Sequence, residues 1–132
     1  MLKARTLTVD IARPPDHIYA FLVDPANLAR WTLVKNGRPA PEAGPNSWRF
    51  DGPRGTVLAH FTPPNPFYVL DYQLQIGPQV THAAHVRVIR NGAGSVLTHT
   101  SVQQPVVSDA MFASEEEWML SDLMVLKTLM EG

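Results

Sequence analysis

The sequence predicts an α+β fold, a curved antiparallel sheet of about six strands around a long C-terminal helix, with two short helices after the first strand. In the first third, one segment alternates between apolar and polar side chains, and two prolines then occupy positions typical of helix N-termini. In the middle, short segments with the same alternation are separated by turn residues. The end holds a long apolar stripe at helical spacing. Short connections favour antiparallel pairing in sequence order, so only the final helix can cover the apolar face of the sheet.

The first third predicts a strand and then two short helices. Residues 4–12 alternate between apolar and polar side chains, as a half-buried strand does. Pro14-Pro15 ends this strand and suits a helix start. Asp24-Pro25 repeats the start, and the second helix is expected to end near Asn36-Gly37, where glycine suits a left-handed stop.

The middle of the chain predicts a loop followed by five strands. The loop covers residues 38–46, which are rich in proline and glycine. The strands are expected at residues 48–51, 56–62, 67–76, 80–90 and 95–104. Asn91-Gly92, between the last two strands, is typical of a tight hairpin.

The last segment predicts one long helix over residues 109–131, opened by Ser108-Asp109. Ser114 and Glu117 form a second possible start, because Ser-x-x-Glu is the capping-box pattern. On that interpretation Glu115, Glu116 and Glu117 lie in a first turn, where they complement the helix dipole. The apolar stripe consists of Phe112, Met119, Leu123, Leu126 and Met130.

Length and composition fit one domain over residues 1–132, with 45% hydrophobic and 17% charged residues. Scattered charges and a formal net charge of -1 argue against a nucleic-acid surface or a polybasic lipid site. The absence of cysteine excludes thiolate metal sites and cysteine nucleophiles, and it fits a reducing cytoplasm. We find neither a signal-peptide pattern nor a membrane span, and we expect a cytoplasmic protein.

A series of apolar and turn residues follows a fixed order over nearly the whole chain. It comprises Ile11–Pro15, Ile18–Leu22, Asp24, Trp31, Val69–Tyr72, Arg87–Ile89, Asn91-Gly92, Gly94-Ser95, Ser108-Asp109, Phe112-Ala113, Asp122-Leu123, Leu126-Lys127 and Leu129. In this series the chain resembles the START-like (SRPBCC) superfamily, in particular its polyketide cyclase/dehydrase-like bacterial members. The resemblance implies a helix-grip (Bet v 1-like) fold with a hydrophobic ligand cavity, and no particular reaction. The superfamily's glycine-rich loop is reduced to Gly52-Pro53-Arg54-Gly55, so we expect no loop function.

The hairpin turns predict which side chains share the cavity face. If Ile76 pairs with Val80, then Leu74 lies opposite His82 and Tyr72 opposite Ala84. If Arg90 pairs with Ser95, then Val86 lies opposite His99 and Val88 opposite Leu97, and a one-residue slip would remove His99 from this face. The predicted face comprises Tyr68, Leu70, Tyr72, Leu74, Ile76, His82, Ala84, Val86, Val88, Leu97 and His99.

Polar groups on this otherwise apolar face are the candidate ligand contacts, because a few hydrogen-bonding groups orient a small molecule in an apolar pocket. The predicted substrate-binding residues are Tyr68, Tyr72, His82, His99, Trp31, Met119 and Leu123. Each also has an ordinary role in core packing as its alternative. The resemblance places Trp31 near the cavity mouth, as a lid, a floor or an anchor of its helix. His82 and His99 are candidate proton-transfer groups, with a tyrosine donating to a carbonyl oxygen.

The leading interpretation is a protein that binds a hydrophobic, partly oxygenated small molecule, lipid- or polyketide-like. One alternative is a cofactor-independent cyclase or dehydratase, and another is a co-chaperone-like interaction module. His82 and His85 face opposite sides of a strand and no further ligands accompany them, so we expect no metal site. No phosphate loop or nucleophile motif is present, and we expect no cofactor. The oligomeric state stays open between monomer and homodimer.

Overall fold

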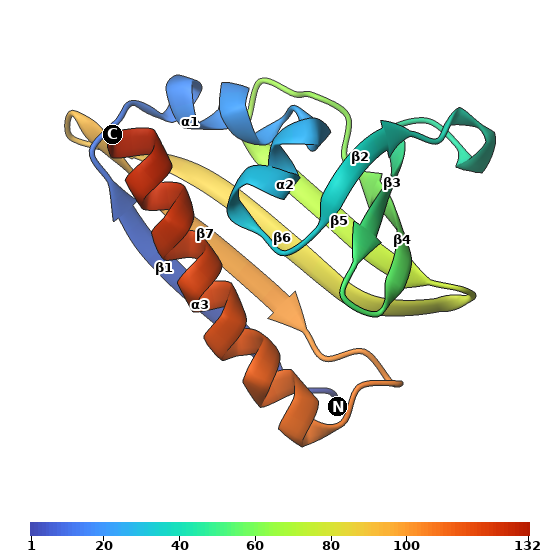
Figure 1. Cartoon of the computed structure of the whole chain (residues 1–132). Coiled ribbons are helices and arrows are strands. Elements are labelled where there is room, and N and C mark those ends of the chain that lie inside the picture. Colours follow the sequence, from blue (N-terminus) through green and yellow to red (C-terminus); the bar gives the residue numbers. More distant parts are fainter.

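The computed structural model describes residues 1–132 and places helix α3 across one face of a seven-stranded antiparallel sheet (Figure 1). The strand order is β1-β7-β6-β5-β4-β3-β2, so the first strand pairs with the last. The strands are β1 Ala4–Ile11, β2 Lys35–Pro39, β3 Ser47–Gly52, β4 Gly55–Phe61, β5 Val69–Ile76, β6 Gln79–Asn91 and β7 Gly94–Val102. The helices are α1 Pro15–Leu22, α2 Leu28–Trp31 and α3 Asp109–Glu131, with 3-10 turns at Pro25–Asn27 and Pro41–Ala43.

The sheet agrees with the expected count of about six strands, and the additional strand is β2. Strand β2 occupies residues expected to end the second helix and begin a loop, and α2 already ends at Trp31. Asn36 does adopt a left-handed conformation, with φ of 55°, but it forms an irregularity in β2 between Lys35 and Arg38. Gly37 lies close to the Phe50 ring, since a Cβ atom at that position would be 2.7 Å from Phe50 Cε1. This glycine therefore serves strand packing and does not end a helix.

The predicted register of the second hairpin is confirmed, and that of the first needs one adjustment. Arg90 pairs with Ser95, and Val86 with His99, as expected. In the first hairpin Leu74 lies opposite His82 as expected, but Ile76 pairs with Gln79 instead of Val80. A register shift between Leu74 and Gln75 absorbs the difference, so Tyr72 and Leu74 keep their predicted partners, Ala84 and His82, on the cavity face.

Helix α3 starts at Asp109, where the Ser108 side chain accepts a hydrogen bond from the Met111 backbone N–H at 3.1 Å. The second possible start at Ser114 is therefore not used. Glu115 to Glu117 lie beyond the first turn, which corrects their interpretation as dipole-complementing residues. Glu116 instead pairs with Arg5 of β1, at 2.8 Å between Oε1 and Nε.

The C-terminal half of α3 is fastened to the sheet. Leu123, Leu126 and Met130 are buried in the core. The backbone N–H of Ala12, just after β1, donates to Glu131 Oε2 at 2.8 Å, and Lys127 pairs with the same carboxylate. Among the first ten residues of the helix only Phe112 is buried, so the helix is less tightly packed there. No helix of the chain is both long and apolar enough to cross a membrane.

Candidate functional site

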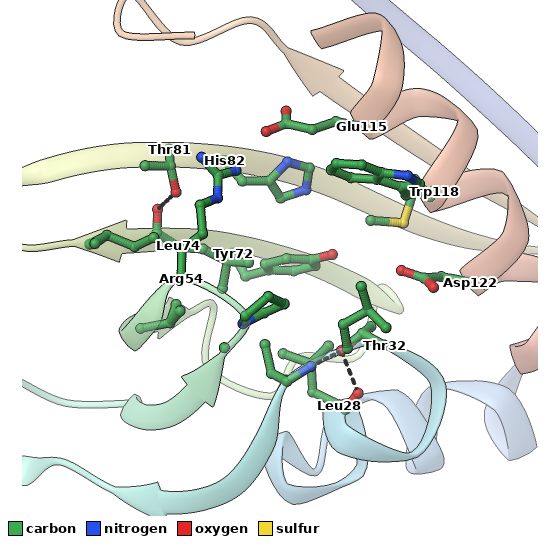
Figure 2. Close-up of a pocket in the computed structure, with 17 residues that line it drawn as sticks. Leu28, Thr32, Arg54, Tyr72, Leu74, Thr81, His82, Glu115, Trp118 and Asp122 are labelled. Carbon is green, nitrogen blue, oxygen red and sulfur yellow. Dashed lines mark hydrogen bonds between the residues drawn. The ribbon is translucent and has the colours of Figure 1, made fainter. Parts of the chain in front are cut away.

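A pocket of about 470 Å³ lies between α3 and the inner face of the sheet (Figure 2). Its size is in the range typical of small-molecule sites. Four parts of the fold line it: the segment from α2 to β2, the β3–β4 hairpin, the inner faces of β5 and β6, and α3. The lining residues are Leu28, Thr32, Leu33, Val34, Gly52, Pro53, Arg54, Val57, Tyr72, Leu74, Ile76, Thr81, His82, Glu115, Trp118, Met119 and Asp122.

Strand alternation explains the sheet wall of the pocket. Tyr72, Leu74 and Ile76 follow one another at every second position of β5, so their side chains share the inner face. Asp71, which precedes Tyr72 and faces the opposite side, pairs with His85 and Arg87 at 3.3 and 2.7 Å. His85 thus lies on the face opposite His82, as strand alternation predicted.

Three rings from adjacent strands form a cluster at the inner end of the pocket wall. His82 lies 5.9 Å from Tyr72 and 5.9 Å from His99 between ring centroids. The Tyr72 hydroxyl is 3.4 Å from His99 Nε2, a long hydrogen bond. Neither His82 Nε2 nor His99 Nδ1 has a hydrogen-bond partner in the protein. We call Tyr72, His82 and His99 the ring cluster.

Burial determines the charge state of the ring cluster. Desolvation lowers the pKa of His82 to about 4. Desolvation and then the neighbouring His82 lower the pKa of His99 to about 3. Burial, with a smaller effect from the Asp122 charge, raises the pKa of the Tyr72 hydroxyl. All three side chains are therefore neutral at pH 7, and each can donate or accept a hydrogen bond.

The helix wall of the pocket carries two carboxyl groups. Glu115, Trp118 and Asp122 occur at spacings of three and four residues, which places them along one flank of the buried stripe of α3. Desolvation raises the pKa of Asp122 to about 6. Desolvation also raises the pKa of Glu115, and the charge of Arg54 opposes this shift. Figure 2 shows the Tyr72 hydroxyl pointing toward Asp122.

The predicted contact residues divide into two groups. Tyr72, His82 and Met119 line the pocket. Trp31, Leu123, His99 and Tyr68 are not among the lining residues. Trp31 and Leu123 are buried members of the hydrophobic core, the packing role that was their alternative. His99 is 1% exposed, on β7, beyond Tyr72 and His82.

Tyr68 precedes β5 in a left-handed conformation, with φ of 57°, which takes its side chain away from the strand alternation. Its ring packs against Tyr19 of α1, at 5.4 Å between centroids. The sequence pattern assumed that β5 began at residue 67, whereas it begins at Val69. The side chain therefore belongs to the contact between α1 and the sheet.

Arg54, Glu115, Trp118 and Asp122 were not predicted as site residues. The shortened loop containing Arg54 carried no expected function, yet Gly52, Pro53 and Arg54 line the pocket. Asp122 and Glu115 lie three and four residues from the predicted contact Met119. This helical spacing is the feature of the sequence that could have placed them on the same side of α3 as Met119. No three histidine, aspartate or glutamate side chains are arranged to hold a metal ion.

Comparison with solved structures establishes the architecture. The aromatase/cyclase Zhui from Streptomyces sp. R1128 is similar with a TM-score of 0.78, 15% identity, and coverage of 99% of this chain and 94% of that chain. The chain has the helix-grip fold. A START superfamily protein from Mycobacterium smegmatis is similar over 97% of both chains, with a TM-score of 0.75 and 16% identity.

The helix-grip fold also appears in the Aha1 dimer from Colwellia psychrerythraea, with a TM-score of 0.75 and 16% identity over 98% of this chain and 97% of that chain. A cyclase, a START superfamily protein and Aha1 thus share this architecture. At sequence identities of 15–16%, the structural similarity establishes the fold alone. No family model and no curated protein matches the sequence. The fold expected from the sequence is confirmed.

Proposed function

We propose that this protein binds a hydrophobic, partly oxygenated small molecule in the pocket between α3 and the sheet. The observation that carries the proposal is one cavity of about 470 Å³ with an apolar wall and a few polar groups inside it. Such a composition buries an apolar skeleton and orients it by a small number of hydrogen bonds. Tyr72, His82 and Asp122 are among the polar groups of the lining, together with Thr32, Arg54, Thr81 and Glu115.

A thermal-shift screen of lipids and aromatic polyketides tests this function, since a ligand that binds only the folded state raises the Tm. A ligand at 100 times its Kd adds about 2.7 kcal/mol of stability, which corresponds to a shift of several degrees in a domain of this size. Native mass spectrometry of protein purified from its source would identify the bound mass.

A matched pair of variants assigns the binding to this pocket. Leu74→Trp fills the cavity from β5, and we expect it to abolish the Tm shift. Gln73→Trp adds the same ring on the opposite, exposed face of that strand and should keep the shift. An equal response of the two variants, or no shift with any compound, would argue against binding in the pocket.

A second candidate is a cofactor-independent cyclase or dehydratase, favoured by the neutral imidazole of His82, which lies 5.9 Å from the Tyr72 ring between centroids and lines the same pocket. His82 would take a proton from a carbon next to a carbonyl group, while Tyr72 donates a hydrogen bond to the carbonyl oxygen. A poly-β-ketone substrate, followed by the absorbance of its aromatic product, tests this activity. We expect His82→Gln to lose turnover while still binding the substrate, and unchanged turnover would exclude His82 as the base.

A further inference from the structure

We propose that the pocket selects an apolar ligand that carries a cationic amine, with the Asp122 carboxylate as its counter-ion. This inference rests on the proposed binding function and names the chemical class of the ligand. It depends on three features of the lining: a carboxylate without a partner, the position of the one arginine, and an aromatic ring one helical turn from the carboxylate.

The carboxylate of Asp122 lines the pocket without any hydrogen bond or ion pair to the rest of the protein. Three other acidic residues of α3 are paired: Asp109 with Lys3, Glu116 with Arg5, and Glu131 with Lys127. Glu115 has no ion pair, but unlike Asp122 it feels the charge of Arg54. A half-buried carboxylate without a donor loses hydration and gains nothing in return. A ligand that brings a charged donor to this position would restore the missing interaction.

Arg54 does not neutralise Asp122. Its side chain is exposed in the β3–β4 turn and lies beside Met111, at 4.0 Å between Nη2 and Sδ. Figure 2 shows it near Glu115, at the end of the pocket away from Asp122. At pH 7 the two carboxylates and one guanidinium give the lining a formal charge of -1, because His82 is neutral. The end of the pocket that holds Asp122 is therefore negative.

Trp118 adds a second contact suited to a cation. It precedes Asp122 by one helical turn, and its ring lies between Glu115 and Asp122 along the pocket wall (Figure 2). An ammonium group over an indole ring is attracted by the negative face of the ring. A ligand carboxylate at the same position would meet Asp122 and be repelled.

The charge of Asp122 makes the selection dependent on pH. Other titratable groups that face this space are Tyr72 on β5, His82 on β6, Arg54 in the β3–β4 turn and Glu115 on α3. The α2–β2 segment contributes only residues without titratable groups, namely Leu28, Thr32, Leu33 and Val34. Because the pKa of Asp122 is about 6, its carboxylate becomes protonated as the pH falls below that value. An alkylamine stays charged over this range, so its affinity should fall together with the charge of Asp122.

Three probes that share a ten-carbon chain test the proposal: n-decylamine, n-decanol and n-decanoate. Their affinities are measured by isothermal titration calorimetry at pH 7.5, with each probe below its solubility or aggregation limit. We expect the amine to bind at least about tenfold more tightly than the alcohol, as a charge-assisted hydrogen bond implies, and the carboxylate to bind most weakly. At pH 5.0 the amine should lose about tenfold in affinity, and the alcohol should bind unchanged.

Asp122→Asn should bring amine and alcohol to within about threefold of each other, since it keeps the shape of the side chain and removes its charge. Glu117→Gln changes the net charge equally, but on the solvent-exposed side of α3, and should leave the preference intact. If Asp122→Asn does not fold, two measurements on the unmodified protein still test the inference. They are the order of affinities of the three probes and the pH dependence of amine binding.

Equal or weaker binding of the amine relative to the alcohol would overturn the inference while leaving the proposed function standing. So would an amine preference that survives in Asp122→Asn. Failure of all three probes to bind, with no Tm shift in the wider screen, would instead remove the proposed function itself.

Discussion

At the scale of single residues, the ring cluster sets two histidines in an environment that keeps them uncharged. Burial lowers the pKa of His82 to about 4 and that of His99 to about 3, from an ordinary value near 6.5. Between these values and pH 6.5 the unfolded chain binds protons at both positions and the folded chain does not. The free energy of unfolding therefore falls as the pH falls from 6.5 toward 4.

Asp122 opposes this trend. Its pKa is raised to about 6, so between pH 6 and its ordinary value of 3.8 the folded chain holds a proton that the unfolded chain releases. This carboxyl group stabilises the fold as the pH falls through that window. Two imidazoles with larger shifts outweigh one carboxyl group, and the net effect of these three groups is loss of stability in acid.

We predict that His99→Gln reduces the acid sensitivity of the fold. Between pH 7.0 and 4.5 the protein should lose about 2.5 kcal/mol of unfolding free energy through His99, because each pH unit well below 6.5 contributes about 1.4 kcal/mol. Urea unfolding at the two pH values measures this loss. The variant should lose less stability between them than the unmodified protein, and His17→Gln, at an exposed position of α1, should behave as the unmodified protein. Equal losses in all three proteins would contradict the prediction.

At the scale of elements, β2 shows how one close contact can decide between a helix end and a strand. Asn36-Gly37 suits a left-handed helix stop, and local preference alone predicted one. In the fold this segment pairs with β3, and Gly37 is the position where the Phe50 ring approaches the backbone. Phe50 is fully buried, so the ring has no room to move away. The neighbouring strand therefore sets the role of this glycine.

We predict that Gly37→Ala destabilises the fold by about 1 to 3 kcal/mol, because the added methyl group overpacks the buried Phe50 ring. Chemical denaturation measures the loss. In a double-mutant cycle, Phe50→Leu should reduce the cost of Gly37→Ala, since it removes the ring atoms in conflict. An alanine cost that is the same in both backgrounds would show that the ring is not the cause.

At the scale of the whole molecule, α3 has two functions in its two halves. Its C-terminal half is fastened by Leu123, Leu126 and the contacts of Glu131 near the end of β1. Its N-terminal half contributes Glu115, Trp118 and Met119 to the pocket lining and has fewer buried side chains. The cavity exists because the helix is held firmly at one end and packs less closely against the sheet toward the other.

We predict that hydrogen exchange distinguishes the halves, because local opening is easier where fewer apolar side chains are buried. Backbone amides over residues 112–119 should exchange faster than those over residues 123–130 in hydrogen–deuterium exchange mass spectrometry. A compound that raises the Tm should slow exchange mainly in the first range. Uniform protection along the helix would contradict the division into two halves.

The sequence by itself determined the long helix, the antiparallel strands and the second hairpin register, and it placed Tyr72 and His82 on the inner face of the sheet. Periodicity and turn chemistry are local, so they can be recognised in the chain alone. Tertiary structure decided β2, the displacement of Tyr68, and the placing of Arg54 and Asp122 in one pocket. These depend on which surfaces meet across long sequence separations, and a partnerless carboxylate is recognised only when all its neighbours are known.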